Sequence, residues 1–142
     1  MKAQSIVAVF LIMLLPVLSF AQQNQRELTP EQLLEARRGE LANFDNYTYR
    51  YLVAAQEGDL QSMEDIRAEM LKIMESETAN FEKQRLADGK ERMEKLRSVA
   101  AGFKTAQLEL PKNSTELPAS LDFIHQYREL VLAALQEMEA AR

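Results

Sequence analysis

The side chains that most often carry out chemistry are few in this chain. His125 is the only histidine, and there is no cysteine among the 142 residues. Without these residues, neither a Cys–His catalytic pair nor a cysteine-based zinc site can be built. The four glycines are scattered, so they cannot form a glycine-rich phosphate-binding loop. Carboxylates are abundant, but almost all of them fall on expected solvent faces, where they serve solubility. The sequence therefore favours a non-enzymatic protein.

His125 raises one specific alternative, a haem site. The exported four-helix bundles that bind haem b resemble this chain in size, and they use a methionine and a histidine as axial ligands. In such a bundle, His125 at the start of the last helix would lie level with Met63 at the start of the second. However, His125 falls at the margin of an apolar arc, and methionines at helical spacing usually fill cores. We therefore expect no cofactor and keep a haem-binding bundle as an alternative.

Two arginines occupy positions where apolar residues are expected. Arg128 lies one turn after Ile124 and one turn before Leu132 on the last helix, and Arg37 has a similar position on the first. Such an arginine either extends its head group to solvent or pairs with a glutamate on a neighbouring helix. The alternative is a charged anchor at a binding surface, where arginine is enriched. The candidate partner-binding residues are Arg128, Phe123, Tyr127, Leu130, Tyr49 and Val53.

Two amphipathic segments that meet at Glu57-Gly58-Asp59 must position these side chains. Apolar residues recur at spacings of three, four and seven on both sides of this hinge, as on one face of a helix. Gly58 can adopt the left-handed conformation that ends a helix, and Asp59 can cap the next one. So short a joint makes the two helices antiparallel. The two stripes are Leu33, Leu34, Leu41, Phe44, Tyr51 and Ala55, then Leu60, Met63, Ile66, Met70, Met74 and Phe81.

Start and stop signals extend this pattern to four helices. Thr29 and Gln32 form a capping box, with Pro30 at the first helical position. Asp88-Gly89 predicts a break, and one long helix over residues 59–108 is the alternative. The predicted helices span residues 30–56, 59–87, 90–108 and 118–141. Either Pro118 or Ser120 opens the last of them. They predict an all-α, up-down-up-down antiparallel four-helix bundle that forms a single domain over residues 29–142.

The last predicted helix is apolar over more than a third of its circumference. That breadth indicates burial on two sides, either at the centre of a monomeric bundle or against a second chain. Self-association through this helix is therefore one expectation, and contact with a different protein is another. The arc consists of Phe123, Ile124, Tyr127, Leu130, Val131, Ala134, Leu135 and Met138.

The N-terminal stretch is typical of a secretory signal peptide. Lys2 gives a positive start, residues 6–20 are almost wholly apolar, and Ser19-Phe20-Ala21 matches the small-x-small pattern of a cleavage site. We expect cleavage after Ala21, a flexible lead-in over residues 22–28, and a periplasmic or secreted protein. The apolar run is shorter than a membrane span, so no membrane insertion is expected after cleavage. The alternative is an uncleaved membrane anchor.

Charge narrows the class of partner. Removal of residues 1–21 takes away one basic residue and no acidic one, which leaves 16 Lys and Arg against 22 Asp and Glu, a formal net charge of −6. Nucleic acids and anionic membrane surfaces require a clustered positive patch, so neither is expected as a partner. The acidic balance suits a basic protein partner. We expect a binding or inhibitor-type module, such as an immunity protein.

The residues Leu28-Thr29-Pro30-Glu31-Gln32 match the LTxxQ signature of Spy-like periplasmic chaperones. This chain resembles that family in its small size, export and predicted helices. The resemblance implies binding of unfolded clients on a concave face. It covers five residues, and the second copy of the motif that the family carries is missing here. Those chaperones also tend to present basic surfaces, whereas this chain is acidic. A chaperone is therefore the alternative function.

Overall fold

The computed structural model describes residues 28–84, 86–113 and 115–141. The predicted signal peptide, its cleavage site and the lead-in up to residue 27 lie outside the described residues. The chain divides into two compact units, Met1–Leu33 and Leu34–Arg142. In the first unit, the described residues 28–33 contain the start of helix α2 (Pro30–Gln56).

The start of α2 is the predicted capping box. The backbone N–H of Gln32 donates to Thr29 Oγ1 at 3.1 Å, and the backbone N–H of Thr29 donates to Gln32 Oε1 at 2.9 Å. Two of the backbone donors at this helix start therefore have side-chain acceptors. Pro30, which lacks an N–H, is the first helical residue.

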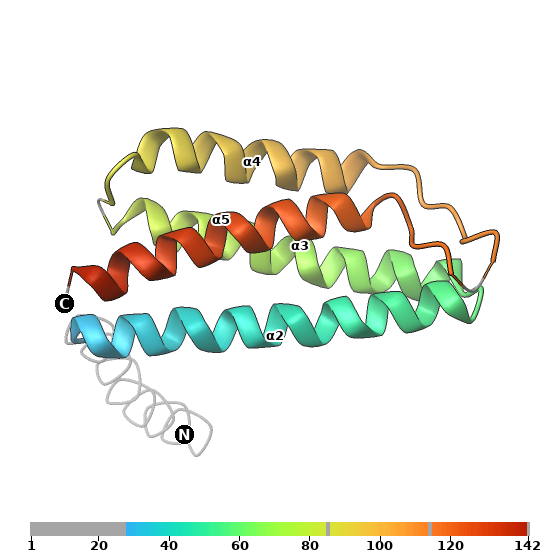
Figure 1. Cartoon of the computed structure of the whole chain (residues 1–142), viewed down its shortest axis with the longest axis horizontal. Helices are drawn as coiled ribbons and strands as arrows, with labels where there is room; N and C mark the ends of the chain where they lie inside the picture. The colour runs from blue at the N-terminus through green and yellow to red at the C-terminus, as the bar shows by residue number, and fades with distance from the viewer. Residues whose placement is uncertain (1–27, 85, 114, 142) are drawn as a thin grey trace, which may run out of the picture. The chain divides into compact units, whose positions relative to one another are not determined.

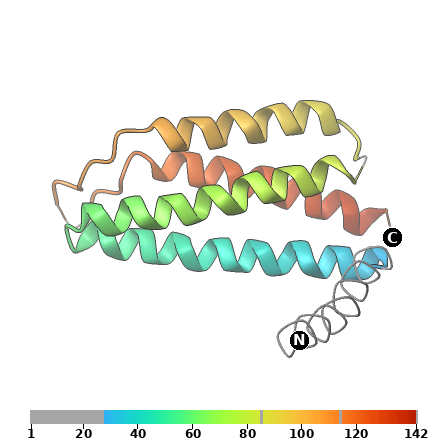
Figure 2. The same cartoon turned by 180° about the vertical axis from the view of Figure 1, so that it is seen from behind.

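The unit Leu34–Arg142 is an all-α four-helix bundle, as predicted. After α2, the chain forms α3 (Leu60–Glu82), α4 (Gly89–Thr105) and α5 (Leu121–Ala140). The helices lie side by side and alternate in direction (Figure 1, Figure 2). Helix α4 packs against both α3 and α5. Among the described residues, no helix has the length and apolar character needed to cross a membrane.

The hinge between α2 and α3 also follows the prediction. Gly58 has a φ of 73°, the left-handed conformation that glycine adopts without strain. The N–H of Asp59 donates to the carbonyl of Ala54 at 2.9 Å, which closes the end of α2. Asp59 Oδ1 then accepts the backbone N–H of Ser62 at 3.1 Å and caps α3. These local bonds turn the chain through the antiparallel reversal.

The predicted break between α3 and α4 is confirmed, but α3 ends five residues before its predicted end at residue 87. Helix α3 ends at Glu82 and α4 begins at Gly89, so the alternative of one long helix is wrong. The left-handed residue is Asp88, with a φ of 54°, and Gly89 is already helical. Aspartate tolerates this conformation better than most residues. Arg92 of α4 pairs with Glu137 of α5 at 2.9 Å.

The connection between α4 and α5 is longer than predicted. Helix α4 ends at Thr105, three residues before the predicted end. Helix α5 begins at Leu121 with Ser120 as its N-cap, which agrees with the second of the two predicted openings and not with Pro118. Pro118 belongs to a turn in which its carbonyl accepts the N–H of Leu121 at 3.0 Å. The hydroxyl of Ser120 is buried and hydrogen-bonds to that of Tyr51 on α2. This bond anchors the long connection to the bundle.

Aromatic side chains fill the core between the helices. Phe44 of α2 packs against Tyr127 of α5, with ring centroids 4.7 Å apart. Tyr51 of α2 meets the edge of Phe103 of α4, with centroids 6.0 Å apart. All four rings are at most 1% exposed. In the unit Leu34–Arg142, the predicted apolar stripes belong to this core except for Leu60, the first residue of α3, which is 42% exposed. Leu33, in the first unit, is half-buried.

A close contact between α4 and α5 depends on Gly102. A Cβ placed on this glycine would overlap the ring of Phe123. We predict that Gly102→Ala lowers the free energy of unfolding by about 1–2 kcal/mol, because the overlap outweighs the gain in helix propensity.

Gly39 on α2 is the matched control, since no atom lies within 4 Å of its added Cβ. Gly39→Ala should stabilise the protein by up to about 1 kcal/mol. Urea denaturation of both variants measures the difference. Equal stabilisation by the two alanines would show that the α4–α5 contact is not tight.

Candidate functional site

Arg128, the first candidate for partner binding, is paired within the chain. Its Nε donates to Asp45 Oδ1 at 2.9 Å, and its Nη2 donates to Asp45 Oδ2 at 3.1 Å. This hydrogen bonding raises the pKa of Arg128. The pair joins α5 to α2 at a partly exposed position. Pairing with an acid on a neighbouring helix was one of the two expectations, although the acid is an aspartate and not a glutamate.

The apolar candidates on α5 are used mainly in packing. Tyr127 is 1% exposed against Phe44, which excludes its ring from a partner surface of the folded chain. Phe123 is half-buried beside Gly102. Leu130 is half-buried and lines a hollow between α4 and α5. The breadth of the apolar arc is therefore accounted for by contacts of α5 with α2 and α4.

The two candidates on α2 differ in accessibility. Tyr49 is 69% exposed, and Val53 is half-buried. The six sequence candidates thus do not form one accessible patch. His125 is exposed while Met63 is completely buried, so these side chains do not form the axial pair of a haem-binding bundle. Within the described ranges, no three His, Cys, Asp or Glu side chains are close enough to hold a metal ion.

A buried ion pair joins Arg37 to a glutamate on a neighbouring helix. Such a pairing was one of the two expectations for Arg37, but the sequence did not identify Glu77 as the partner. Arg37 Nη1 of α2 donates to Glu77 Oε1 of α3 at 2.8 Å, and Asn80 donates to the same oxygen at 3.2 Å. Glu77 is only 3% exposed. Its burial raises its pKa, against the opposing effects of Arg37 and Asn80. Burial also raises the pKa of Tyr127 well above its usual range, and the carboxylate of Glu77 adds to this rise.

The position of this pair identifies it as a cross-link between helices. Arg37 Nε and Glu77 Oε2 are buried without a hydrogen bond among the described residues, so the pair is incompletely satisfied. The position of Glu77 in the sequence indicates that its side chain is buried. Glu77 follows Met74 by three residues and precedes Phe81 by four, which places it on the apolar stripe.

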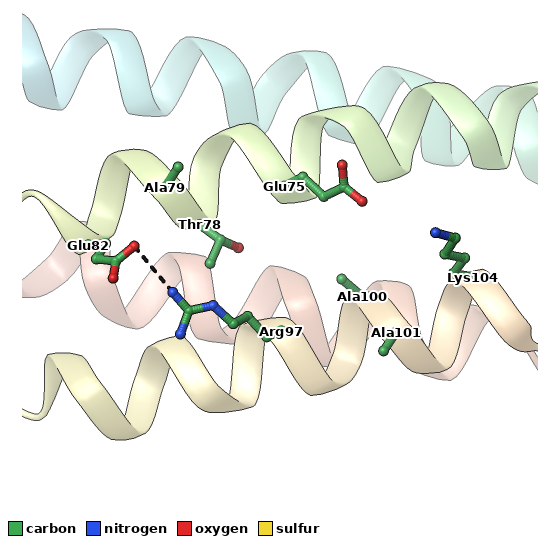
Figure 3. Close-up of a pocket in the computed structure, with 8 residues that line it drawn as sticks. All are labelled: Glu75, Thr78, Ala79, Glu82, Arg97, Ala100, Ala101 and Lys104. Carbon is green, nitrogen blue, oxygen red and sulfur yellow. Dashed lines mark hydrogen bonds and ion pairs between the residues drawn. The ribbon is translucent and has the colours of Figure 1, made fainter.

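A hollow of about 360 Å³ lies between α3 and α4 (Figure 3). At one end, Arg97 Nη2 of α4 pairs with Glu82 Oε2 of α3 at 3.2 Å. At the other end, Glu75 of α3 and Lys104 of α4 lie on opposite sides. The floor between them consists of small side chains, which are Thr78, Ala79, Ala100 and Ala101.

A different surface lies at the end of the bundle that carries both the α2–α3 hinge and the α4–α5 connection (Figure 1, Figure 2). We define the loop end as residues 57–65 and 106–120. Leu110 lies against the hinge, because its Cδ1 is 3.9 Å from a Cβ placed on Gly58. Three of the five large apolar side chains that are exposed in the described chain belong to the loop end, namely Leu60 (42%), Leu110 (39%) and Leu117 (60%).

The loop end is also strongly acidic. Its two segments contain six carboxylates and one basic residue, Lys112. The hydrogen bonds that Asp59 accepts from Ser62 lower its pKa, so this carboxylate stays ionised near neutral pH. Exposed leucines and an excess of carboxylates therefore coincide in these two segments. The six acids are Glu57, Asp59, Glu64, Asp65, Glu109 and Glu116.

Comparisons of the chain with models of known protein families, with curated proteins and with solved structures give no match. The function is therefore inferred from the surfaces described above.

Proposed function

We propose that the chain is a small exported protein-binding module that holds a basic partner at its loop end and carries out no catalysis. The observation that supports this proposal is the coincidence of three exposed leucines with six carboxylates at one end of the bundle. Export rests on the signal-peptide pattern of the N-terminal sequence.

The two features of the loop end have different roles in binding. Burying a fully exposed leucine contributes about 1.5–3 kcal/mol. The three leucines are 39–60% exposed, so covering each one contributes roughly half of that. The carboxylates accelerate encounter with a positively charged partner and disfavour acidic ones. The complementary surface is therefore an apolar patch surrounded by lysine or arginine. A basic toxin or enzyme would present such a surface. The chain would then inhibit this partner as an immunity protein does.

The proposal predicts that loop-end substitutions weaken or slow partner binding. Leu60→Ser combined with Leu117→Ser should weaken binding of the partner recovered from the native envelope by at least about tenfold, because two apolar contacts are lost. Glu64→Gln combined with Asp65→Gln should slow association and reduce its salt dependence. Surface plasmon resonance at two ionic strengths measures both effects.

Glu35→Gln combined with Glu94→Gln is the matched control. It removes the same amount of charge from exposed positions on α2 and α4, outside the loop end. This control should bind as the parent does. Equal weakening by control and loop-end variants would indicate a dependence on net charge alone, and the proposed docking surface would be wrong.

The exposed leucines would also suit an unfolded client of a Spy-like chaperone. In this chain, Thr29 and Gln32 of the LTxxQ letters form the cap of α2. A chaperone should suppress aggregation of several unrelated clients at both low and high salt. A module for one basic partner should protect none of them, so a light-scattering assay with acidic and basic clients separates the two functions.

A further inference from the structure

The charges beside the α3–α4 hollow repeat with a fixed step. Glu75 precedes Glu82 by seven residues on α3, and Lys104 follows Arg97 by seven on the antiparallel α4. Seven residues make two helical turns, about 10.5 Å along the axis. Because Glu82 pairs with Arg97, Glu75 and Lys104 are also at similar heights on opposite helices. One side of the hollow is therefore acidic and the other is basic (Figure 3).

This pattern is complementary to itself. We propose that the α3–α4 face is the interface of a homodimer, in which a second copy of the chain is the occupant. A two-fold axis parallel to the helices places α3 of each copy opposite α4 of the other without changing height along the axis. Glu82 then lies opposite Arg97 of the second copy, and Glu75 lies opposite its Lys104.

The charges also favour this arrangement over a dimer whose two-fold axis runs across the helices. A two-fold axis across the helices would place α3 on α3, so that carboxylates would face carboxylates. A different protein would need an acid and a base at the same two-turn step, whereas a second copy supplies them automatically. Ala79 and Ala101, which are both exposed, let the two faces approach closely.

The area of the α3–α4 face determines how tightly the dimer is expected to bind. Helix α4 has 17 residues. It is therefore about 25 Å long, and two adjacent helices are about 20 Å wide. The two copies together would bury about 1,000 Å², at the lower limit for specific interfaces. We therefore expect a reversible dimer that forms in the micromolar to millimolar range. The dimer leaves the loop end of each copy outside this interface, so it is independent of the proposed function.

Sedimentation of the purified protein over that concentration range tests the dimer. The parent should show a monomer–dimer equilibrium. Lys104→Glu should raise the dissociation constant by about tenfold or more, because each copy then presents like charges to the other. Glu75→Lys should have the same effect. Both residues are exposed and outside the core, so the far-ultraviolet dichroism and melting temperature should stay close to those of the parent.

Charge exchange makes the test specific for the proposed geometry. The double variant Glu75→Lys, Lys104→Glu should return the dissociation constant to within about threefold of the parent value. An equimolar mixture of the two single variants should form mixed dimers, since each opposes the charges of the other. A parent that is monomeric throughout, a dimer insensitive to Lys104→Glu, or a double variant that stays monomeric would each overturn the proposal.

Discussion

Replacing Arg37 by leucine is expected to lower the free energy of unfolding by about 3–5 kcal/mol at pH 7. The substitution leaves Glu77, which is 3% exposed, as a buried charge whose one cationic hydrogen-bond donor has been removed. Removing one partner of a buried pair costs more than removing both, because the isolated charge stays desolvated. Adding Glu77→Leu to Arg37→Leu should therefore recover most of the lost stability. Urea denaturation of the single and double variants measures both quantities.

The same variant should regain stability in acid. Burial already raises the folded-state pKa of Glu77, and loss of Arg37 raises it further. A raised folded-state pKa contributes stability that is fully present below the unfolded value, about 4.3, and is lost as the pH rises through the folded value. The gap between parent and variant should therefore narrow from pH 7 to about pH 4.5.

The neighbouring arginine supplies the control for this pair. Arg38 pairs with Glu139 at 2.9 Å, but both side chains are about half exposed. Exposed pairs of this kind typically contribute 0–1 kcal/mol, so Arg38→Leu should have a small and nearly pH-independent effect. A loss for Arg37→Leu no larger than that for Arg38→Leu would contradict the structural role of the buried pair.

Phe44→Ala should produce a loss of similar size, about 3–5 kcal/mol, through a different cause. Phe44 is completely buried and packs against Tyr127, so the truncation leaves a cavity between α2 and α5. Tyr49→Ala on the same helix is the control, because Tyr49 is 69% exposed and should change stability by less than about 0.5 kcal/mol. Calorimetric melting temperatures should separate the two variants clearly. Similar melting temperatures would place Phe44 outside the core.

Local chemistry explains why much of the fold was predictable. The capping box at Thr29 and the left-handed Gly58 fix the ends of α2 through bonds between residues close in sequence. The apolar spacing then identifies the buried face of each helix without any tertiary information. The start of α5 was left open between Pro118 and Ser120, because the hydroxyl of Ser120 is held by Tyr51 of another helix and not by a local bond.

The sequence allowed Arg37 a glutamate partner on a neighbouring helix but did not identify which one, because the contact joins distant residues. Glu77 occupies an apolar position because Arg37, 40 residues earlier, supplies its counter-charge. A carboxylate at a stripe position, together with an arginine at a stripe position on the neighbouring helix, was the available signal. Leu60 was assigned to the core by its spacing, but it is the first residue of α3 and lies where the bundle ends. Leu110 and Leu117 lie in a connection without helical periodicity, so their exposure had no sequence signal.

The docking role of the loop end is tested most directly by nuclear magnetic resonance of the labelled protein during titration with a cationic amphipathic peptide of alternating leucine and lysine blocks. We predict that the largest chemical-shift changes map to residues 57–65 and 106–120, and that they diminish at high salt. Chemical-shift changes along the outer faces of α2 or α5, or no changes at the highest peptide concentration tested, would contradict the proposed docking role of the loop end.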